Sequence, residues 1–286
     1  MKPENSIETK EQKIDHVVLQ EEEEVSWDGD NDAANPLNWP SSTKWTVITV
    51  VIMQAILSPI ASTILAIGAK EIADDFHLTS AKLPVFPIAF YILGIGMGPL
   101  VLAPCSELYG KRIVYLLSFT SFAVLNLGCG FSPNIGVLTV LRFLSGVAGS
   151  VGPTLSSGSV GDVFAVAERG KAQAIVSLGP VFGPVLGGVV GGFVVYHTSG
   201  WRWLLWIVSI AAAGVCCLSF CLLKETYAPF ILAQKAASLN REHPRTRYYV
   251  HDKAPVKDLF ARSITRPVRL LFTSPILGFM ALYQSL

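Results

Sequence analysis

The fold is decided by residues 172–201, AQAIVSLGPVFGPVLGGVVGGFVVYHTSGW, a stretch that contains no Asp, Glu, Lys or Arg. About 20 apolar residues cross a bilayer as a helix, so a stretch of this length predicts a membrane span. Six further stretches lack the same four residue types: 45–69, 83–106, 113–141, 143–161, 203–223 and 270–286. The sequence therefore predicts an all-α integral membrane protein.

The number of spans depends on how the long stretch 113–141 is divided. It exceeds one span and contains the turn signal Phe131-Ser132-Pro133-Asn134, so we divide it there. The fourth span then covers about residues 135–157, with Arg142 inside it. We expect a six-helix unit over residues 45–223, a linker over residues 224–269, and a truncated seventh membrane helix over residues 270–286.

Composition excludes several classes of protein. Hydrophobic residues make up 51% of the 286 residues and charged residues only 15%, which excludes a disordered chain and most soluble enzymes. A net charge of +1, without a basic stripe between aromatic residues, indicates no nucleic-acid binding. The five histidines lack paired metal-ligand spacing, and the sequence holds no nucleophile–base arrangement or phosphate loop. We therefore expect that the protein is not an enzyme and that it has no cofactor and no metal site.

The segments that flank the six helices differ in charge. Residues 1–44 contain the run Glu21 to Glu24 and no apolar signal segment, so we expect an acidic, disordered tail. After Lys224 the linker holds nine Lys or Arg and four acids, and residues 230–240 predict a short amphipathic helix at the membrane face. Both segments are expected in the cytosol.

The distribution of Lys and Arg supports this orientation. If the tail lies in the cytosol, six Lys or Arg residues lie in cytosolic loops or at cytosolic helix ends: Lys44, Lys111, Arg112, Arg169, Lys171 and Lys224. Three lie on the outer side: Lys70, Lys82 and Arg202. Cytosolic loops collect Lys and Arg. We therefore expect a multi-pass protein of the plasma membrane with a cytosolic amino terminus.

The first of three motifs is the loop after the second span, which ends Glu107-Leu108-Tyr109-Gly110-Lys111-Arg112. An acid, a glycine and two cations within six residues predict a tight turn whose charges pair with helix ends and neighbouring loops. The alternative is an ordinary turn that is basic because it lies in the cytosol.

The second motif is Arg142, followed by Asp162 and by Glu168-Arg169-Gly170-Lys171. Arg142 lies roughly 10 Å below the outer end of its helix, at 1.5 Å per residue. A charge there is costly unless it faces a cavity or a partner, which makes Arg142 a functional-site candidate. Alternatively its guanidinium extends to the surface or caps carbonyl groups of neighbouring helices as a structural pin.

The third motif lies in the stretch quoted first. Its glycines recur every four residues on one helix face, where another helix backbone can approach closely; they are Gly179, Gly183, Gly187 and Gly191. Pro180 and Pro184 each remove a backbone donor, which softens or kinks the helix. Close packing together with a bend suits a helix that moves.

In this order, on the second, fourth and fifth helices, the motifs resemble those of the major facilitator superfamily. The fifth-helix motif resembles the signature of its drug:proton antiporters. The flanking sequences Asn35-Pro36-Leu37-Asn38-Trp39-Pro40 and Lys224-Glu225-Thr226-Tyr227-Ala228-Pro229 are similar to those of the fungal branch. The resemblance covers nearly everything from Asn35 onward. It implies proton-coupled efflux of small amphipathic or cationic compounds such as drugs, toxins or secondary metabolites.

The resemblance also implies roles for individual residues. Arg142 would serve proton coupling. A cytosolic gate would comprise Glu107, Gly110, Lys111, Arg112, Asp162 and Arg169. The antiporter motif would comprise Gly179, Pro180, Gly183, Pro184, Gly187 and Gly188. Polar side chains expected to line a substrate cavity, each alternatively a helix–helix hydrogen bonder, are Gln54, Ser58, Ser62, Thr63, Tyr91, Ser145, Ser150 and Thr154.

The sequence also departs from the family pattern. Ala103 replaces the usual leading glycine of the first motif, and Ser145 stands where the family often has glutamine. The family has twelve helices in two halves with the substrate held between them, and this sequence holds one half. Two functional classes stay open. One is a secondary exporter, whose partners are the bilayer, a small-molecule substrate, protons and, in one arrangement, a second half. The other is a truncated fragment that does not transport.

Overall fold

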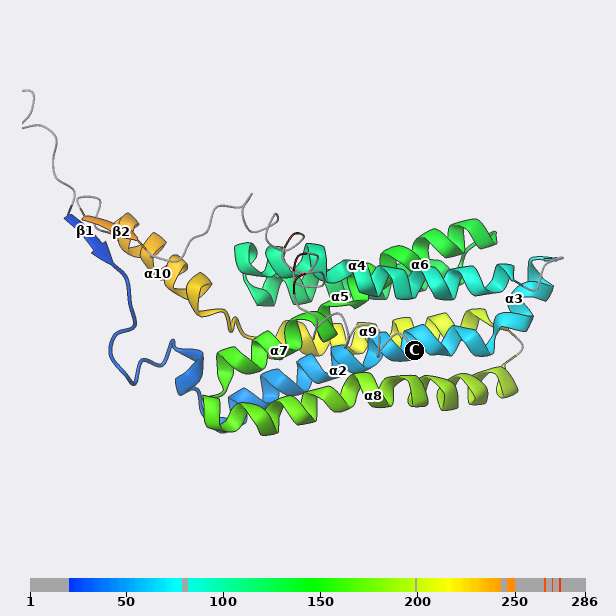
Figure 1. The fold of residues 1–286 in the computed structure, drawn as a ribbon, viewed down its shortest axis with the longest axis horizontal. Coiled ribbons are helices and arrows are strands. Elements are labelled where there is room, and N and C mark those ends of the chain that lie inside the picture. The colour runs from blue at the N-terminus through cyan, green and yellow to red at the C-terminus, as the bar shows by residue number, and fades with distance from the viewer. Residues whose placement is uncertain are drawn as a thin grey trace, which may run out of the picture.

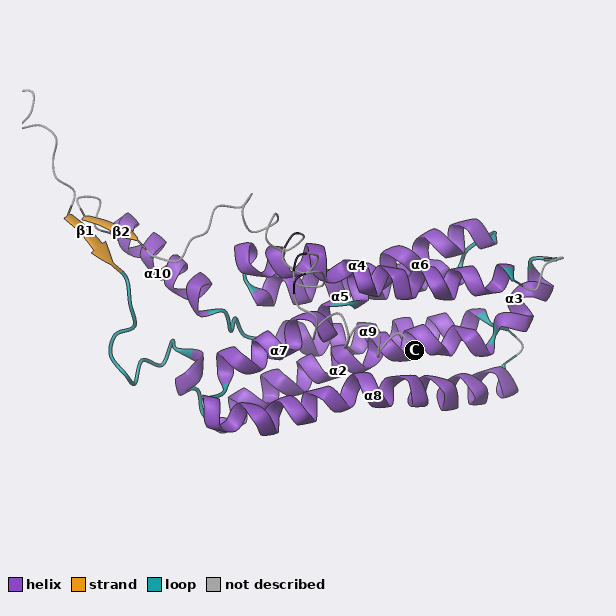
Figure 2. Cartoon of the chain, viewed as in Figure 1, coloured by secondary structure: helices purple, strands orange, loops and turns teal. Residues whose placement is uncertain are grey.

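The computed structural model describes residues 21–78, 82–198, 200–242 and 246–249, together with Thr265, Arg269 and Thr273. Within this part, six helical spans are long and apolar enough to cross a membrane. Figures 1 and 2 show them lying lengthwise beside one another, with a short helix and two strands beyond one end. The predicted all-α membrane fold is therefore confirmed. The predicted seventh helix, residues 270–286, lies outside the described residues except for Thr273.

The spans follow the charge-free stretches closely. They are α2 (Ser41–Ile67), α4 (Phe86–Tyr109), α5 (Lys111–Gly130), the pair α6 (Ile135–Gly149) and α7 (Val151–Val163), α8 (Val166–His197) and α9 (Arg202–Leu222). The shorter elements are β1 (Glu21–Glu24), η1 (Pro36–Asn38), α3 (Ala69–Asp75), η2 (Leu83–Val85), α10 (Ala228–Glu242) and β2 (Thr246–Tyr249). We call the end where α9 leads towards α10 the linker end.

The fourth span is longer than predicted and is interrupted. It runs to Val163 rather than to about residue 157, and the interruption between α6 and α7 falls at Ser150. Pro153 has no N–H to donate to the carbonyl of Gly149, which explains a break at this point. The predicted turn before the span is confirmed, because the Asn134 side chain accepts the Val137 N–H at 2.9 Å and begins α6.

Folded structure begins earlier than we predicted. Residues 1–20 of the expected disordered tail lie outside the described residues, but from Glu21 the chain forms β1, which pairs in parallel with β2. The Asp32 carboxylate accepts N–H groups of Asp28 and Ala34 at 3.0 and 2.8 Å, which lowers the pKa of Asp32. Residues 21–44 of the expected disordered tail thus have described structure, and for residues 21–28 the linker supplies partners that composition does not reveal. The helix predicted in the linker is present as α10.

Helix α2 lies at the centre of the bundle, where it contacts α8, α7 and α9. Helix α4 packs along α6, and α5 packs along α9 and α6. The buried apolar side chains form one large cluster and a smaller one among α2, α7 and α8. Large apolar side chains such as Leu117, Val124 and Phe193 point outward, as expected for helices surrounded by lipid.

The glycine ridge of α8 lies against α2. A Cβ atom at Gly183 would stand 2.7 Å from Pro59 Cβ and 3.0 Å from the Ile56 carbonyl oxygen, closer than side chains tolerate. A Cβ atom at Gly187 would stand 2.8 Å from the Ile60 carbonyl oxygen. Gly188, which belongs to the same motif, has nothing within 4 Å of its Cβ position. The motif therefore combines a packing face with positions that α2 does not touch.

We expect Gly183→Ala to weaken the packing of α8 on α2, because the added methyl group meets the backbone and ring of α2. Overpacking of this kind costs about 1–3 kcal/mol. The apparent melting temperature of the purified protein in detergent should fall. Gly188→Ala is the matched control, and it should be neutral or slightly stabilising because alanine favours helices over glycine. Equal melting temperatures for the two variants would contradict this packing role.

Candidate functional site

Arg142 is completely buried among four helices. From α6 it donates one terminal N–H to the Ala61 carbonyl of α2 at 2.9 Å and another to Asn126 Oδ1 of α5 at 3.3 Å. The guanidinium carbon lies 4.8 Å from the centre of the Tyr91 ring of α4. These contacts match the alternative of a structural pin, because a single side chain ties α2, α4 and α5 to α6.

The charge of Arg142 has no acidic partner among the described residues. Across the six spans, the only Asp and Glu residues are Glu107, Asp162 and Glu168, and all three lie at the linker end. The Nε atom of Arg142 is buried and has no hydrogen-bond partner in the described part of the chain. A buried charge in a membrane is costly even when hydrogen-bonded. Stability alone therefore gives a weak reason for an arginine at this position.

Two polar pairs lie between neighbouring helices, and one of them includes Tyr91. Tyr91 donates its hydroxyl to the Ser58 carbonyl at 2.9 Å, and its oxygen lies 3.3 Å from Ser58 Oγ. Gln54 on α2 donates to Ser219 on α9 at 2.8 Å, while its Oε1 is buried without a partner. Sequence reasoning proposed Gln54, Ser58 and Tyr91 for a cavity, and each of them makes a hydrogen bond between helices.

The other proposed cavity hydroxyls mostly bond to carbonyl groups of their own helix. Ser62, Ser145 and Ser150 donate to the carbonyls of Pro59, Arg142 and Val147, respectively, at 2.7 to 3.0 Å. Thr63 on α2 also reaches the Pro184 carbonyl of α8 at 3.2 Å. Thr154 is half-buried on α7. Their role in binding a substrate stays a prediction.

A charge cluster closes the linker end of the bundle. The Lys111 ammonium at the start of α5 lies 2.6 Å from Asp162 Oδ2 near the end of α7, and both side chains are largely buried. Arg169 donates to the carbonyls of Phe164 and Gly161 at 3.0 and 2.8 Å and so caps the end of α7. The structure thus brings together three residues of the expected gate.

Two other residues of the expected gate do not join this cluster. Glu107 and the side chain of Arg112 are exposed, and neither makes an ion pair within the described residues. Gly110 does take part, because its backbone has φ +85°, a conformation that favours glycine, and it allows α5 to start directly after α4.

Sequence reasoning missed Glu225, which completes the cluster. Its carboxylate accepts the N–H groups of Lys111 and Arg112 at 3.0 Å each, which are the first two residues of α5. It also accepts the N–H groups of Thr226 and Tyr227 at 3.0 Å. A carboxylate is favourable at a helix amino terminus. The only sequence signal was its place in the flanking segment Lys224-Glu225-Thr226-Tyr227, which local spacing cannot connect with a loop so far away.

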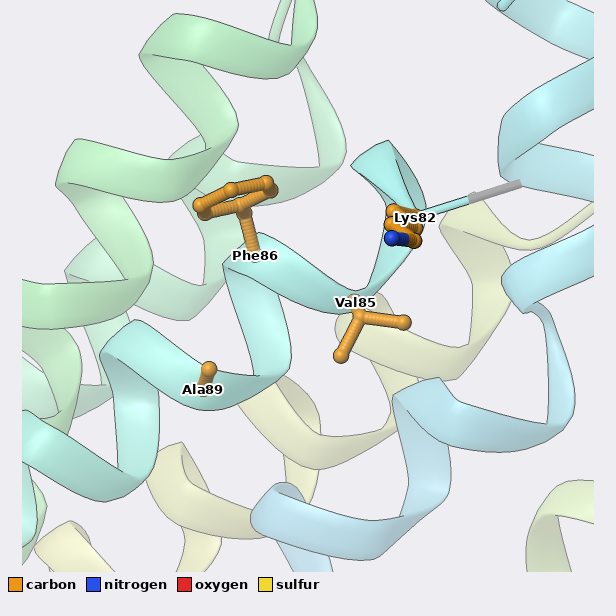
Figure 3. Close-up of a pocket in the computed structure, with 4 residues that line it drawn as sticks. All are labelled: Lys82, Val85, Phe86 and Ala89. Atoms are coloured by element: carbon orange, nitrogen blue, oxygen red, sulfur yellow. The ribbon is translucent and has the colours of Figure 1, made fainter. Parts of the chain in front are cut away.

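The opposite end of the bundle carries a second ion pair and a pocket. Arg202 donates to Asp75 Oδ2 at 2.7 Å, and Trp201 Nε1 donates to the same oxygen at 3.2 Å, which fastens α3 to the start of α9. Figure 3 shows a pocket lined by Lys82, Val85, Phe86 and Ala89, where η2 leads into α4. None of the proposed cavity residues lines it. The described residues hold no group of three or more His, Cys, Asp or Glu that could bind a metal ion.

Known proteins resemble this chain in sequence. The model of the Major Facilitator Superfamily matches residues 51–286. The chain is 40% identical over 261 residues to "MFS-type transporter penM" of Penicillium rubens, covering 91% of this chain and 51% of that protein. It is 34% identical over 263 residues to "Efflux pump radE" of Floropilus chiversii, covering 91% and 49%. The chain thus spans about half the length of the curated relatives it matches.

Solved structures share the fold. The proton:xylose symporter XylE, bound to 6-bromo-6-deoxy-D-glucose, superimposes with a TM-score of 0.62 over 85% of this chain and 57% of that one. The two sequences are only 16% identical, so this likeness concerns the fold alone. It confirms the prediction of a six-helix half of the fold. Together with the family match and the relatives, it shows that the chain belongs to the major facilitator superfamily, whose members are transporters and not enzymes.

Proposed function

We propose that this chain forms half of a proton-coupled exporter of small amphipathic or cationic compounds. The observation that carries the proposal is Arg142, a fully buried charge in a membrane helix that no described acid neutralises. Such charges are retained in membrane proteins chiefly for ion or substrate pathways. Relatives that are named as transporters and as an efflux pump support the direction of transport.

The proposed role of Arg142 is electrostatic. Its fixed positive charge favours release of a proton from any acid that comes near and binding of a proton once that acid moves away. The six described spans hold acids only at the linker end and none beside Arg142, so an acid that comes near Arg142 belongs to the transported compound or to a residue outside these spans. The same lack of acids leaves a cationic substrate without a carboxylate partner in this half. Of the two substrate classes, the site favours the amphipathic one.

We propose that the linker end is the cytosolic end and that the Lys111–Asp162 pair is the gate there. The excess of Lys and Arg at this end supports this orientation in the plasma membrane. In the superfamily's fold one half rocks against the other around a substrate site at the midplane. A charge pair that joins α5 to α7 holds two helices of this half together at the cytosolic surface. The gate therefore depends on Lys111 and Asp162 more than on Glu107 and Arg112.

We expect Arg142→Met to abolish the dependence of export on the proton gradient while the protein remains folded. Coupling free energies of 1–3 kcal/mol correspond to about 5- to 150-fold effects on affinity, so export should fall by about tenfold or more. Export of a fluorescent amphipathic dye is measured in vesicles at several imposed pH gradients, with the longest product that the gene encodes.

The control for Arg142→Met is Arg202→Met, which removes an arginine of the exposed ion pair at the opposite end. This variant should keep the gradient dependence. Arg142→Lys tests the charge apart from its geometry, since lysine keeps the charge but lacks the planar fork that reaches two helices. Unchanged gradient dependence in Arg142→Met would overturn the proton-coupling role and leave a structural pin.

We expect Asp162→Asn to weaken the gate, because Lys111 then lacks the opposite charge it contacts at 2.6 Å. A charged, largely buried hydrogen bond contributes about 1.5–3 kcal/mol. Thermal unfolding and dye export should both report the loss. Glu107→Gln changes a neighbouring exposed acid and should affect neither measurement. If the two variants behaved alike, the gate would not depend on this pair.

The alternative of a fragment that does not transport is tested by the size of the native product. We expect an antibody against residues 1–20 to detect a product of about twice 30.9 kDa, because the relatives are about twice as long as this chain. A stable product of 30.9 kDa without proton-dependent export, alone or with a crosslinked second half, would favour the fragment instead.

A further inference from the structure

The amino-terminal segment lies against the linker, although the two are far apart in the sequence. Strand β1 pairs in parallel with β2, in the register Glu21 with Thr246 through Glu24 with Tyr249. The Val25 N–H donates to the Tyr249 carbonyl at 3.0 Å and extends the pairing by one residue, and the Val25 side chain is buried. Figure 1 shows both strands beyond the linker end of the bundle, beside α10.

Helix α10 contacts both segments of this pairing, the residues that follow β1 and the strand β2 itself. The Lys235 ammonium lies 2.6 Å from Asp28 Oδ1 and donates to the Ser26 carbonyl at 3.2 Å. The Asn240 side chain donates to the Tyr248 carbonyl at 2.9 Å and accepts the Tyr248 N–H at 2.7 Å. Residues 21–28, α10 and β2 therefore form one unit, which we call the strap.

The strap reaches the charge cluster through Glu225. The carboxylate of Glu225 bonds the backbone that leads into α10 and, at the same time, the first two N–H groups of α5. Phe230 of α10 lies against Gly110, where an added Cβ would stand 2.9 Å from the Phe230 ring and 2.5 Å from the carboxylate. The Lys111 ammonium lies 5.6 Å from the centre of the Tyr227 ring while it pairs with Asp162.

The start of α5 depends on this contact. The first N–H groups of a helix have no partner within the helix and need a cap. Gly110, the residue before α5, has no side chain to provide one. Glu225 provides it from the short segment that leads directly into α10, so a strap that moves away pulls the cap of α5 with it. The tail part of the strap is held more weakly, because the Lys235–Asp28 pair is exposed and such pairs contribute little.

We propose that the strap regulates the gate: docked through Glu225, it fixes the first turn of α5 and with it the Lys111–Asp162 pair, and its release loosens both. This inference rests on the proposed function, because the pair is the proposed gate. A reversible contact between the tail and the linker thereby sets the conformation of the transport helices.

The first experiment tests whether the strap is docked in the membrane. Two cysteine pairs are compared in inside-out vesicles, with the five native cysteines replaced by alanine: Glu24→Cys with Tyr249→Cys, and Glu21→Cys with Tyr249→Cys. The first pair matches the parallel register and the second would match an antiparallel one. With a mild oxidant, the first pair should form its disulfide at least about tenfold faster. Equal rates would overturn the proposal.

The second experiment tests whether the strap controls the gate. Gly161→Cys places a reporter thiol beside Asp162, where a Cβ atom meets nothing within 4 Å. Its rate of alkylation by a water-soluble maleimide is measured from the cytosolic side. Glu225→Gln should raise this rate by about fivefold or more, and deletion of residues 1–28 should raise it in the same direction. Glu242→Gln, an exposed acid at the far end of α10, is the matched control and should leave it unchanged.

The outcomes separate this proposal from the proposed function. If neither Glu225→Gln nor the deletion changes the rate relative to Glu242→Gln, the strap does not regulate the gate. The deletion removes no residue of the six spans, so it remains informative if Glu225→Gln fails to fold. Neither readout requires transport. If the protein with an unaltered Arg142 showed no proton-dependent export, while Glu225→Gln and the deletion still raised the alkylation rate, only the proposed function would be overturned.

Discussion

The close approach of α8 to α2 is the constraint on which the rest of the bundle depends. Helices surrounded by lipid gain little from burying apolar surface against one another, so they associate through close packing and hydrogen bonds. The glycines of α8 let the two backbones meet, and this holds α2 at the centre, in contact with α7 and α9 as well. From that position the Ala61 carbonyl of α2 receives the bond from Arg142. A buried charge is thus tolerated because the central helix is fixed.

The fold could be predicted from the sequence to the extent that it depends on local pattern. The charge-free stretches predicted the six spans, and residues Phe131 to Asn134 predicted the turn before α6. The glycines that recur every four residues in α8 predicted the face on which it packs. Features that depend on distant partners escaped prediction. The pairing of β1 with β2 and the cap that Glu225 provides for α5 join segments whose contact no local spacing records. The break at Ser150 has a local cause in Pro153, a proline inside the predicted fourth span.

In the candidate site, too, some residues could be predicted from local pattern and others could not. Arg142 was identifiable because a charge inside an apolar stretch is costly in a membrane. Its partners were not, since a backbone carbonyl and the face of an aromatic ring carry no signal in the sequence. Asn126 was missed because one polar residue in an apolar helix is common. Glu107 and Arg112 entered the expected gate by their place in a motif, and the structure leaves both side chains exposed, outside the contacts that join the helices.

Helix α5 connects the two charged sites. Lys111 and Arg112 at its start meet Asp162 and Glu225 at the linker end, and Asn126, fifteen residues further along, accepts a bond from Arg142. At 1.5 Å per residue these points lie about 22 Å apart along one helix. Between these points α5 contains no proline and no interruption, which are the usual causes of a sharp kink. We therefore expect a tilt of α5 that separates Lys111 from Asp162 to change the contact between Asn126 and Arg142 as well. The proposed gate and the buried charge are thus joined by one continuous helix, of which the first motif covers only the first two residues.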